Sequence, residues 1–217
     1  MHNNSNKNLN QSTLAIHSTD NTYCFAYREN KNDQYDNFLI KKFENDLCNN
    51  LVIDFHEFIS NENLKKIKQI SVSIGPSNFN ASRLVVVLAR TISQQINCPL
   101  HGFSSFELMA KRIALNNEIY KKNESFWIYK KLKRKGFIAG KYELTVPNLK
   151  NKNFTVKEKV APKLLEDLKK TELNFVAVYK DEKDLTELLN LSNKNLSISN
   201  SNSWTEVLPL YPISAIN

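Results

Sequence analysis

The apolar residues of this chain repeat with two different spacings, which predicts both strands and helices. Short apolar runs at residues 13–16 and 23–27 flank a polar turn, and this order predicts a β-hairpin. Two further apolar runs, at residues 70–74 and 100–103, are separated by a predicted helix from residue 81 to residue 97. A strand–turn–helix–strand order of this kind is typical of α/β sheets.

Two predicted helices, residues 45–59 and 81–97, are amphipathic. The apolar residues expected on the buried side of the first helix are Leu47, Leu51, Val52, Phe55, Phe58 and Ile59. The core stripe expected on the second consists of Val85, Leu88, Ala89, Ile92 and Ile96, and Leu84 and Val87 widen it. Ile53 and Val86 fall outside these stripes, so we expect both side chains to point away from the sheet. The second helix is apolar nearly all round in its first half, which favours coverage on its outer side by a second protein.

The second half of the chain predicts a further set of elements. A helix is expected at residues 106–115, and alternation at residues 126–132 predicts a strand that turns at Gly136 into another strand at residues 137–146. The remaining expectations are a short helix at 162–170, a strand at 174–179, a helix at 184–191 and a Ser/Asn-rich linker at 192–204.

The turn after the strand at residues 70–74 is a candidate ligand site. Gly75 permits a sharp backbone angle and Pro76 ends the strand. Asn80 or Ser82 is expected to cap the following helix. A helix N-terminus behind a turn can bind an anion, but this turn contains one glycine and no lysine. It is therefore a poor phosphate cradle, and we interpret it as an ordinary connection between strand and helix.

Composition narrows the class of protein. The chain has 217 residues, 41% of them hydrophobic, which is enough for one substantial core or two small ones. It contains no run of about 18 apolar residues, so no membrane span or membrane partner is expected. Residues 1–12 are polar and Asn-rich, and we expect a disordered tail there. The three cysteines lie far apart without a metal or disulfide spacing, which favours a reducing cytoplasm.

The chain is basic, with a formal net charge of +8. This charge favours nucleic acid or acidic partners, but it would also follow from a general bias towards Lys, Asn and Ile. One basic zone is interleaved with the aromatic residues Trp127, Tyr129 and Phe137. Its residues are Lys130, Lys131, Lys133, Arg134 and Lys135. They could bind RNA by phosphate contacts and stacking, or they could form the wet face of a hairpin.

No catalytic or metal-binding constellation is evident. The four histidines lie in unrelated contexts, and His56-Glu57 lacks a second metal ligand at helical spacing. No acidic residues are expected to pair in apolar surroundings, where their pKa values would be tuned. With only 4 glycines, the chain lacks glycine-dependent nucleotide loops, so we expect no cofactor.

Four segments nevertheless resemble one known family. Residues 73–83, SIGPSNFNASR, are similar to the G-x-G-P-G-S-F-T-G-L-R signature of the TsaB family, also called YeaZ. Residues 98–107, CPLHGFSSFE, resemble that family's I-P-L-x-G-V-S-S-L-E. Residues 14–19, LAIHST, resemble its L-A-I-D-T-S opening, and residues 208–212, LPLYP, its P-x-Y-L-R close. Three signature glycines are replaced by Ser73, Ser77 and Ala81, so the chain would be a divergent member.

The resemblance implies an α/β fold of the duplicated ribonuclease-H-like kind, as in the actin, sugar-kinase and chaperone-ATPase superfamily. It implies two lobes with mixed sheets, which we place at residues 13–110 and, for a smaller and more divergent lobe, 111–217. In ATP-using members of that superfamily, an aspartate in the first hairpin handles the metal. His17 stands there in this chain, and imidazole does not replace a carboxylate as a magnesium ligand.

The resemblance further implies a non-catalytic subunit. TsaB-like proteins pair with a catalytic homologue, TsaD. With the ATPase TsaE they help to add threonylcarbamoyl to adenosine 37 of tRNAs that read ANN codons, so tRNA would be an indirect partner. A homodimer is an alternative assembly. The surface we expect at the partner consists of Ile53, His56, Arg83, Val86, Val87 and Arg90.

Two other classes of function stay open at the level of sequence. One is an enzyme, either a nucleotide-dependent transferase or a peptidase of the kind once assigned to related proteins. His17 argues against the first, and the lack of a nucleophile–base pair argues against the second. The other class is an RNA-binding module that uses the basic zone, for which salt-dependent tRNA binding would be the evidence.

Overall fold

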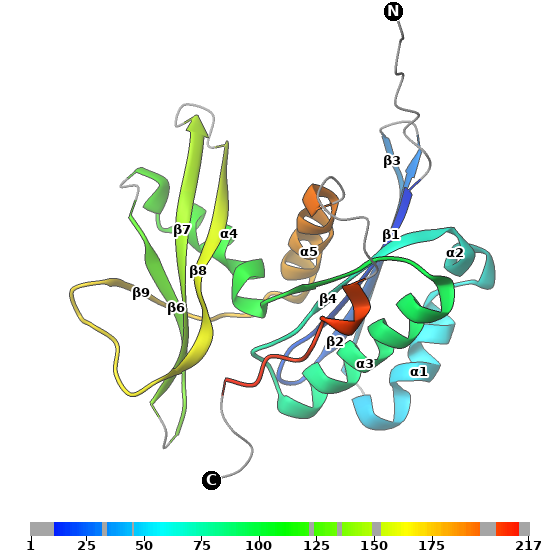
Figure 1. Ribbon diagram of the computed structural model, residues 1–217, viewed down its shortest axis with the longest axis horizontal. Helices are drawn as coiled ribbons and strands as arrows, with labels where there is room; N and C mark the ends of the chain where they lie inside the picture. The colour runs from blue at the N-terminus through cyan, green and yellow to red at the C-terminus, as the bar shows by residue number, and fades with distance from the viewer. Residues whose placement is uncertain are drawn as a thin grey trace, which may run out of the picture.

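Two mixed β-sheets, each with its own hydrophobic core, form two lobes (Figure 1). The structure is a computed structural model that describes residues 11–31, 34–44, 46–121, 124–133, 136–148, 153–195 and 203–212. None of the helices in these ranges is both long and apolar enough to span a membrane.

The first sheet has five strands in the order β3-β2-β1-β4-β5. Strand β1 (Gln11–Ser18) pairs antiparallel with β2 (Tyr23–Lys31), which pairs antiparallel with β3 (Gln34–Phe43). Strand β4 (Ile67–Ser73) is parallel to β1, and β5 (Leu100–Phe103) is parallel to β4. The predicted hairpin and the predicted strand–helix–strand unit are both present.

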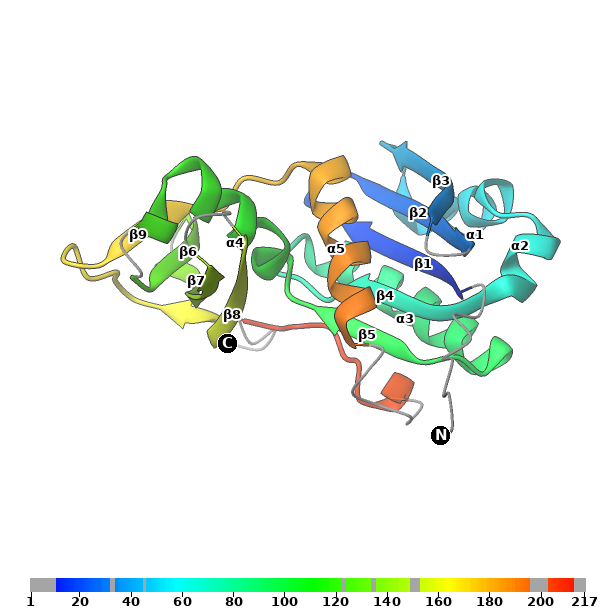
Figure 2. The same cartoon turned by 90° about the horizontal axis from the view of Figure 1, so that it is seen from above.

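The two faces of this sheet are covered by different helices (Figures 1 and 2). On one face, α1 (Leu47–Phe58) and α3 (Phe79–Ile96) pack on large side chains such as Ile16 and Phe25. The short α2 (Asn61–Lys66) leads from α1 into β4. On the other face, α5 (Asp181–Asn195) packs its leucines against the small residues Ala15, Cys24 and Ala26.

The second sheet repeats the plan of the first with four strands in the order β8-β7-β6-β9. Strand β6 (Phe126–Lys131) pairs antiparallel with β7 (Phe137–Asn148) and parallel with β9 (Leu173–Val176), and β7 pairs antiparallel with β8 (Asn153–Leu165). Helix α4 (Ser105–Asn116) covers one face, followed by the short η1 (Ile119–Lys121). The repeated strand order confirms the predicted duplicated α/β fold with mixed sheets.

The two lobes are not two consecutive segments of the chain divided at residue 110, the boundary predicted from the sequence. Helix α4 begins at Ser105, before the predicted boundary. Helix α5 and the segment 203–212 return to the first lobe, where the amide of Leu210 donates to the carbonyl of Ile74 (2.8 Å). The tail predicted at residues 1–12 mostly lies outside the described residues, but Gln11 and Ser12 belong to β1.

The helix predicted at residues 162–170 is wrong, because β8 continues through Pro162 to Leu165. Proline lacks a backbone donor, yet β8 is an edge strand, where a ladder hydrogen bond can be absent. The register between β7 and β8 shifts next to Gly140, and a Cβ on that glycine would lie 3.2 Å from Pro162 Cγ. The glycine therefore makes room for the proline ring at this irregularity.

Candidate functional site

The turn between β1 and β2 is closed by its own hydrogen bonds. The amide of Thr19 donates to the carbonyl of Thr22 (2.8 Å), and the hydroxyls of the same two residues lie 2.7 Å apart. The amide of Thr22 in turn donates to the hydroxyl of Thr19 (3.2 Å). The polar groups that a phosphate-binding turn would offer to a ligand are thus used within the turn itself.

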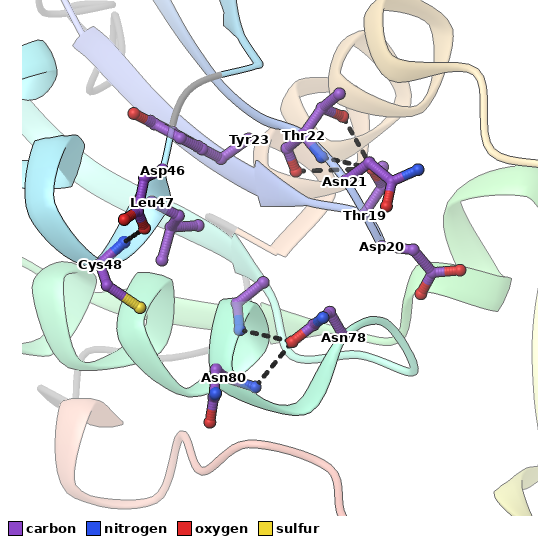
Figure 3. Close-up of a pocket in the computed structure, with 11 residues that line it drawn as sticks. Thr19, Asp20, Asn21, Thr22, Tyr23, Asp46, Leu47, Cys48, Asn78 and Asn80 are labelled. Carbon is purple, nitrogen blue, oxygen red and sulfur yellow. Dashed lines mark hydrogen bonds between the residues drawn. The ribbon is translucent and has the colours of Figure 1, made fainter.

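A cavity of about 230 Å³ lies beside this turn, between the N-termini of α1 and α3 (Figure 3). Asp46 caps α1 by accepting from the amide of Cys48 (3.0 Å). Asn78, rather than the expected Asn80 or Ser82, caps α3 by accepting from the amides of Asn80 (3.0 Å) and Ala81 (3.4 Å). Among the described residues, the side chains around the cavity include two carboxylates, Asp20 and Asp46, and no basic group. A site of this kind disfavours a phosphate, because the amides of Cys48, Asn80 and Ala81 already donate to capping side chains and Asp46 adds a carboxylate.

Two of the contacts between the lobes involve turns of the first lobe. Lys130 at the end of β6 forms an ion pair with Asp20 in the β1–β2 turn. The hydroxyl of Tyr179, just after β9, donates to the carbonyl of Pro76 in the turn before α3. Both contacts connect the second lobe to turns at the ends of strands of the first sheet.

His17, which replaces the family's aspartate, is fully buried. Neither ring nitrogen has a hydrogen-bond partner in the described part of the chain. Burial lowers the pKa of His17 to about 4, although the nearby carboxylate of Asp181 opposes this shift. The imidazole is therefore neutral at pH 7. The described residues contain no group of three or more His, Cys, Asp and Glu that could hold a metal ion.

One residue of the expected partner surface is misplaced, because Val86 is fully buried in the first core. The buried stripe of α3 includes two serines, Ser82 and Ser93, whose hydroxyls donate to the carbonyls of Asn78 (3.1 Å) and Cys98 (2.6 Å). The apolar pattern alone could not place serines inside, and this shifted the predicted phase of the helix.

Helix α1 shows the same effect. Asp54 is buried because it accepts a hydrogen bond from the hydroxyl of Tyr23. Val52, predicted to face the core, is 66% exposed instead. Because Asp54 is buried, the buried side of α1 differs from the side predicted from the apolar residues alone.

The remaining residues of the expected surface lie on the outward sides of α1 and α3. Ile53 is 57% exposed and Val87 is 52% exposed, and His56 and Arg83 are also exposed. Arg90 is half-buried, with its guanidinium 5.9 Å from the ring of Trp204. We call Val52, Ile53, His56, Arg83 and Val87 the outer helix face.

The residues of the predicted basic zone are separated by the fold. Lys130 faces the cleft and is paired with Asp20, whereas Lys131 and Lys133 are exposed. Arg134 and Lys135 lie outside the described residues. The zone is therefore not one surface within the described part of the chain.

A half-buried group of carboxyls between α4 and the second sheet was not predicted from the sequence. Burial, aided by Glu158 and Glu187, raises the pKa of Glu107 to about 7. The hydroxyl of Tyr142 lies 3.2 Å from Glu158 Oε2 and 3.1 Å from the hydroxyl of Ser104, the N-cap of α4. The expectation that no acidic residues pair in apolar surroundings is wrong here, because Glu158 of β8 and Glu187 of α5 are far from Glu107 in sequence.

A second missed pair joins α4 to α5. Arg112 donates to the buried carboxylate of Asp184 (2.7 Å), which also accepts from the amide of Lys180 (2.7 Å). Burial raises the pKa of Asp184, while the hydrogen bonds from Lys180 and Arg112 oppose this change. The pair links the helix of the second lobe to the helix that covers the first sheet.

Comparisons with known proteins place the fold. No model of a known protein family matches the chain, and no curated protein matches it in sequence. YeaZ from Pseudomonas aeruginosa superposes with a TM-score of 0.64 at 13% identity, covering 93% of this chain and 99% of that one. A second solved structure, described as an uncharacterized protein with similarity to peptidase YeaZ from Pseudomonas aeruginosa, gives 0.66 at 11% identity, covering 94% and 100%. The chain thus has a YeaZ-like fold along nearly its whole length.

Proposed function

We propose that this protein is a non-catalytic, TsaB-like subunit of the machinery that adds threonylcarbamoyl to adenosine 37 of tRNAs reading ANN codons. In this proposal it pairs with a TsaD-type catalytic homologue in the cytoplasm, and a TsaE-type ATPase completes the complex. The observation that carries the proposal is the YeaZ-like fold, which covers 93% to 94% of the chain in two solved structures.

The site geometry supports the non-catalytic part of the proposal. The β1–β2 turn uses its own polar groups, the neighbouring cavity has no basic lining residue, and His17 is buried and neutral. The ion pair of Asp20 with Lys130 crosses the region where a superfamily nucleotide would lie. A protein with such a site acts more readily as a scaffold than as a nucleotide-using enzyme.

The outer helix face supports the pairing part. Three exposed apolar side chains, Val52, Ile53 and Val87, lie on two adjacent helices (Figure 1). Arg83 and His56 on the same face add polar groups, and arginine is enriched at protein interfaces. Two helices of a homologous chain could pack on this face as a four-helix interface.

Co-purification tests the proposal directly. The tagged protein should retain a TsaD homologue, and Val87→Glu or Ile53→Glu should abolish this association because a charge would be buried without a partner. The matched control is Leu115→Glu on α4, an exposed leucine away from the outer helix face, which should leave association unchanged. Wild-type affinity in both outer-face variants would place the interface elsewhere, and self-association alone would indicate a homodimer.

The reaction is tested in cells that lack the protein. Depletion should lower threonylcarbamoyl-adenosine in bulk tRNA, as measured by mass spectrometry of digested tRNA. Restoring the wild-type chain should restore the modification, whereas the Val87→Glu variant should not. Unchanged modification after depletion, in cells without a second TsaB-like chain, would overturn the proposed function.

A further inference from the structure

The two faces of the second sheet differ in what covers them. Phe126 and Ile128 of β6 are buried with α4, and so are Tyr142 and Leu144 of β7. Because side chains alternate along a strand, Trp127 and Tyr129 point to the opposite face, where they are only half-buried. Along β8, three lysines on this second face are exposed, namely Lys157, Lys159 and Lys163, whereas Leu165 opposite Phe137 is half-buried. In the described part of the chain this face therefore has no helix packed over it.

Strand register brings aromatic and basic side chains together on this face. Trp127 pairs with Lys141, and Tyr129 pairs with Ala139, which in turn pairs with Lys163. Lys131 pairs with Phe137. We call the following residues the open face: Trp127, Tyr129, Lys131, Phe137, Lys141, Lys157, Lys159 and Lys163.

The aromatic residues of the open face are held in defined positions. The rings of Tyr129 and Phe137 meet edge to face, with 5.5 Å between centroids. The indole N–H of Trp127 donates to Glu172 Oε2 (2.8 Å), and Lys141 Nζ lies 5.5 Å from the ring centroid. Fixed rings of this kind lose little entropy when a flat ligand stacks on them.

The charge of the open face is positive after its internal pairs are counted. Lys141 pairs with Glu172 (2.8 Å) and Lys159 pairs with Glu143 (2.9 Å). Lys131, Lys157 and Lys163 are exposed and have no ion-pair partner among the described residues. Three lysines without an ion-pair partner lie beside three half-exposed aromatic rings. This combination is suited to a ligand that carries several negative charges and planar groups.

We propose that the open face binds single-stranded nucleic acid, with phosphates at Lys131, Lys157 and Lys163 and a base stacked at Tyr129 and Phe137. Backbone neutralisation by lysine together with base stacking on aromatic rings is the usual chemistry of single-strand binding. A duplex fits less well, because its bases are not available to stack on the rings. A protein partner also fits less well, because lysine is depleted in the centres of protein interfaces. The open face is separate from the outer helix face, so the inference does not depend on the proposed function.

Fluorescence anisotropy with labelled 12-nucleotide RNA and DNA of mixed sequence tests this proposal at several salt concentrations. The wild-type chain should bind single strands more tightly than a duplex of the same length. Replacing Lys131, Lys157 and Lys163 by Gln should lower affinity at least about tenfold at low salt. It should also reduce the slope of log affinity against log salt by roughly two, because about 0.7 of a counterion is released per neutralised phosphate. RNA bound more tightly than DNA would assign the ligand to RNA, and equal affinity would assign it to single strands of either kind.

The stacking step is tested separately with Tyr129→Ala, which should weaken binding by about fivefold or more without changing the salt slope. If this variant fails to fold, quenching of Trp127 fluorescence on binding, in a Trp204→Phe background, gives the same information.

The charge-matched control for the lysine triple variant replaces the exposed Lys65, Lys68 and Lys183 by Gln and should retain wild-type affinity.

Four outcomes would overturn the proposal. They are no binding by the wild-type chain, an equal loss in the control triple variant, equal affinity for duplex, and binding that is insensitive to Tyr129 with no quenching of Trp127. The last would mean that the lysines attract any polyanion. If the lysine triple variant instead loses a bound protein and no nucleic acid binds, the open face is a protein-docking surface and the proposal is wrong.

Discussion

At the scale of single residues, neighbours in sequence have opposite environments in this protein. Val86 is fully buried and Val87 is 52% exposed, although both lie in the same turn of α3. Residues of the same type also differ: His17 is buried without a hydrogen-bond partner among the described residues, whereas His56 is exposed. Stability should therefore respond very differently to substitutions that look equivalent in sequence.

The valine pair gives a direct measurement of this difference. Val86→Ala should lower the free energy of unfolding by roughly 2 kcal/mol, because it removes buried methyl groups and leaves a cavity. Val87→Ala should change it by less than about 0.5 kcal/mol. Urea unfolding of the two variants measures both values. Equal losses would mean that α3 is rotated from its position in this structure.

His17 should make stability depend on pH. Burial lowers the pKa of His17 to about 4, below its ordinary value of about 6.5. Between these values the unfolded chain binds a proton that the folded chain does not, so the free energy of unfolding falls as pH drops through this window. The loss should be on the order of 2 kcal/mol and should be absent in His17→Gln. Urea unfolding at pH 7 and pH 4.5 is the measurement.

The exposed His56 provides the control for this prediction. His56→Gln makes the same substitution at an exposed position and should change the free energy of unfolding by less than about 0.5 kcal/mol. A pH dependence that is the same in His17→Gln and in the wild-type protein would show that His17 titrates normally.

At the scale of elements, α5 has a special position, because it follows the second sheet in sequence but covers the first. Its leucines pack on small residues, and Arg28 of β2 donates to the carbonyl of Leu189 (2.7 Å). Near its N-terminus, Asp184 accepts from Arg112 of α4. The contacts at Asp184 therefore hold both α5 and the arrangement of the two lobes.

Removal of this carboxylate should loosen α5. Asp184→Ala leaves the Arg112 charge without its partner and should cost about 3 kcal/mol of stability. Cys24, buried beneath α5, should then react faster with a thiol reagent in a Cys48→Ser background, in which the exposed thiol is removed. Asp167→Ala, at an exposed carboxylate, is the matched control. Unchanged labelling of Cys24 would show that α5 is held by its leucines alone.

At the scale of the whole molecule, the two lobes repeat one sheet plan and contact each other through side chains at the turns of the first lobe. Lys130 with Asp20, and Tyr179 with Pro76, connect the second lobe to two turns of the first. The likeness to YeaZ extends over 93% to 94% of the chain and therefore includes both sheets. The YeaZ-like fold of this chain thus includes side-chain contacts that join the two lobes.

Calorimetry should detect no binding of ATP with magnesium at micromolar concentrations. The reasons are the self-paired turn, the acidic cavity and the neutral His17. His17→Asp should not create a site, because the turn still lacks glycine and the new carboxylate would be buried near Asp181. A micromolar, magnesium-dependent ATP site in the wild-type chain would contradict this prediction.

The sequence by itself determined the elements whose signals are local. The hairpin, the unit from β4 to β5 and the amphipathic helices were predictable, because turn residues and apolar spacing act over a few neighbouring positions. The same pattern placed Ile53 and Arg83 on an outward surface, where the structure also has them. The segments that resemble the TsaB family lie in these regular parts.

Tertiary structure alone decided which polar residues are buried and which distant residues meet. Ser82, Ser93 and Asp54 lie inside because each has a hydrogen-bond partner that no apolar pattern reveals, and their burial turned Val86 inward and Val52 outward. Lys130 is not part of a basic surface because its ammonium group pairs with Asp20, which lies 110 residues earlier in the sequence. Residues 162–165 belong to a strand because they pair with β7, where Gly140 leaves space for the ring of Pro162. Pairing energies between distant segments outweigh local propensity, and they exist only once the chain has folded.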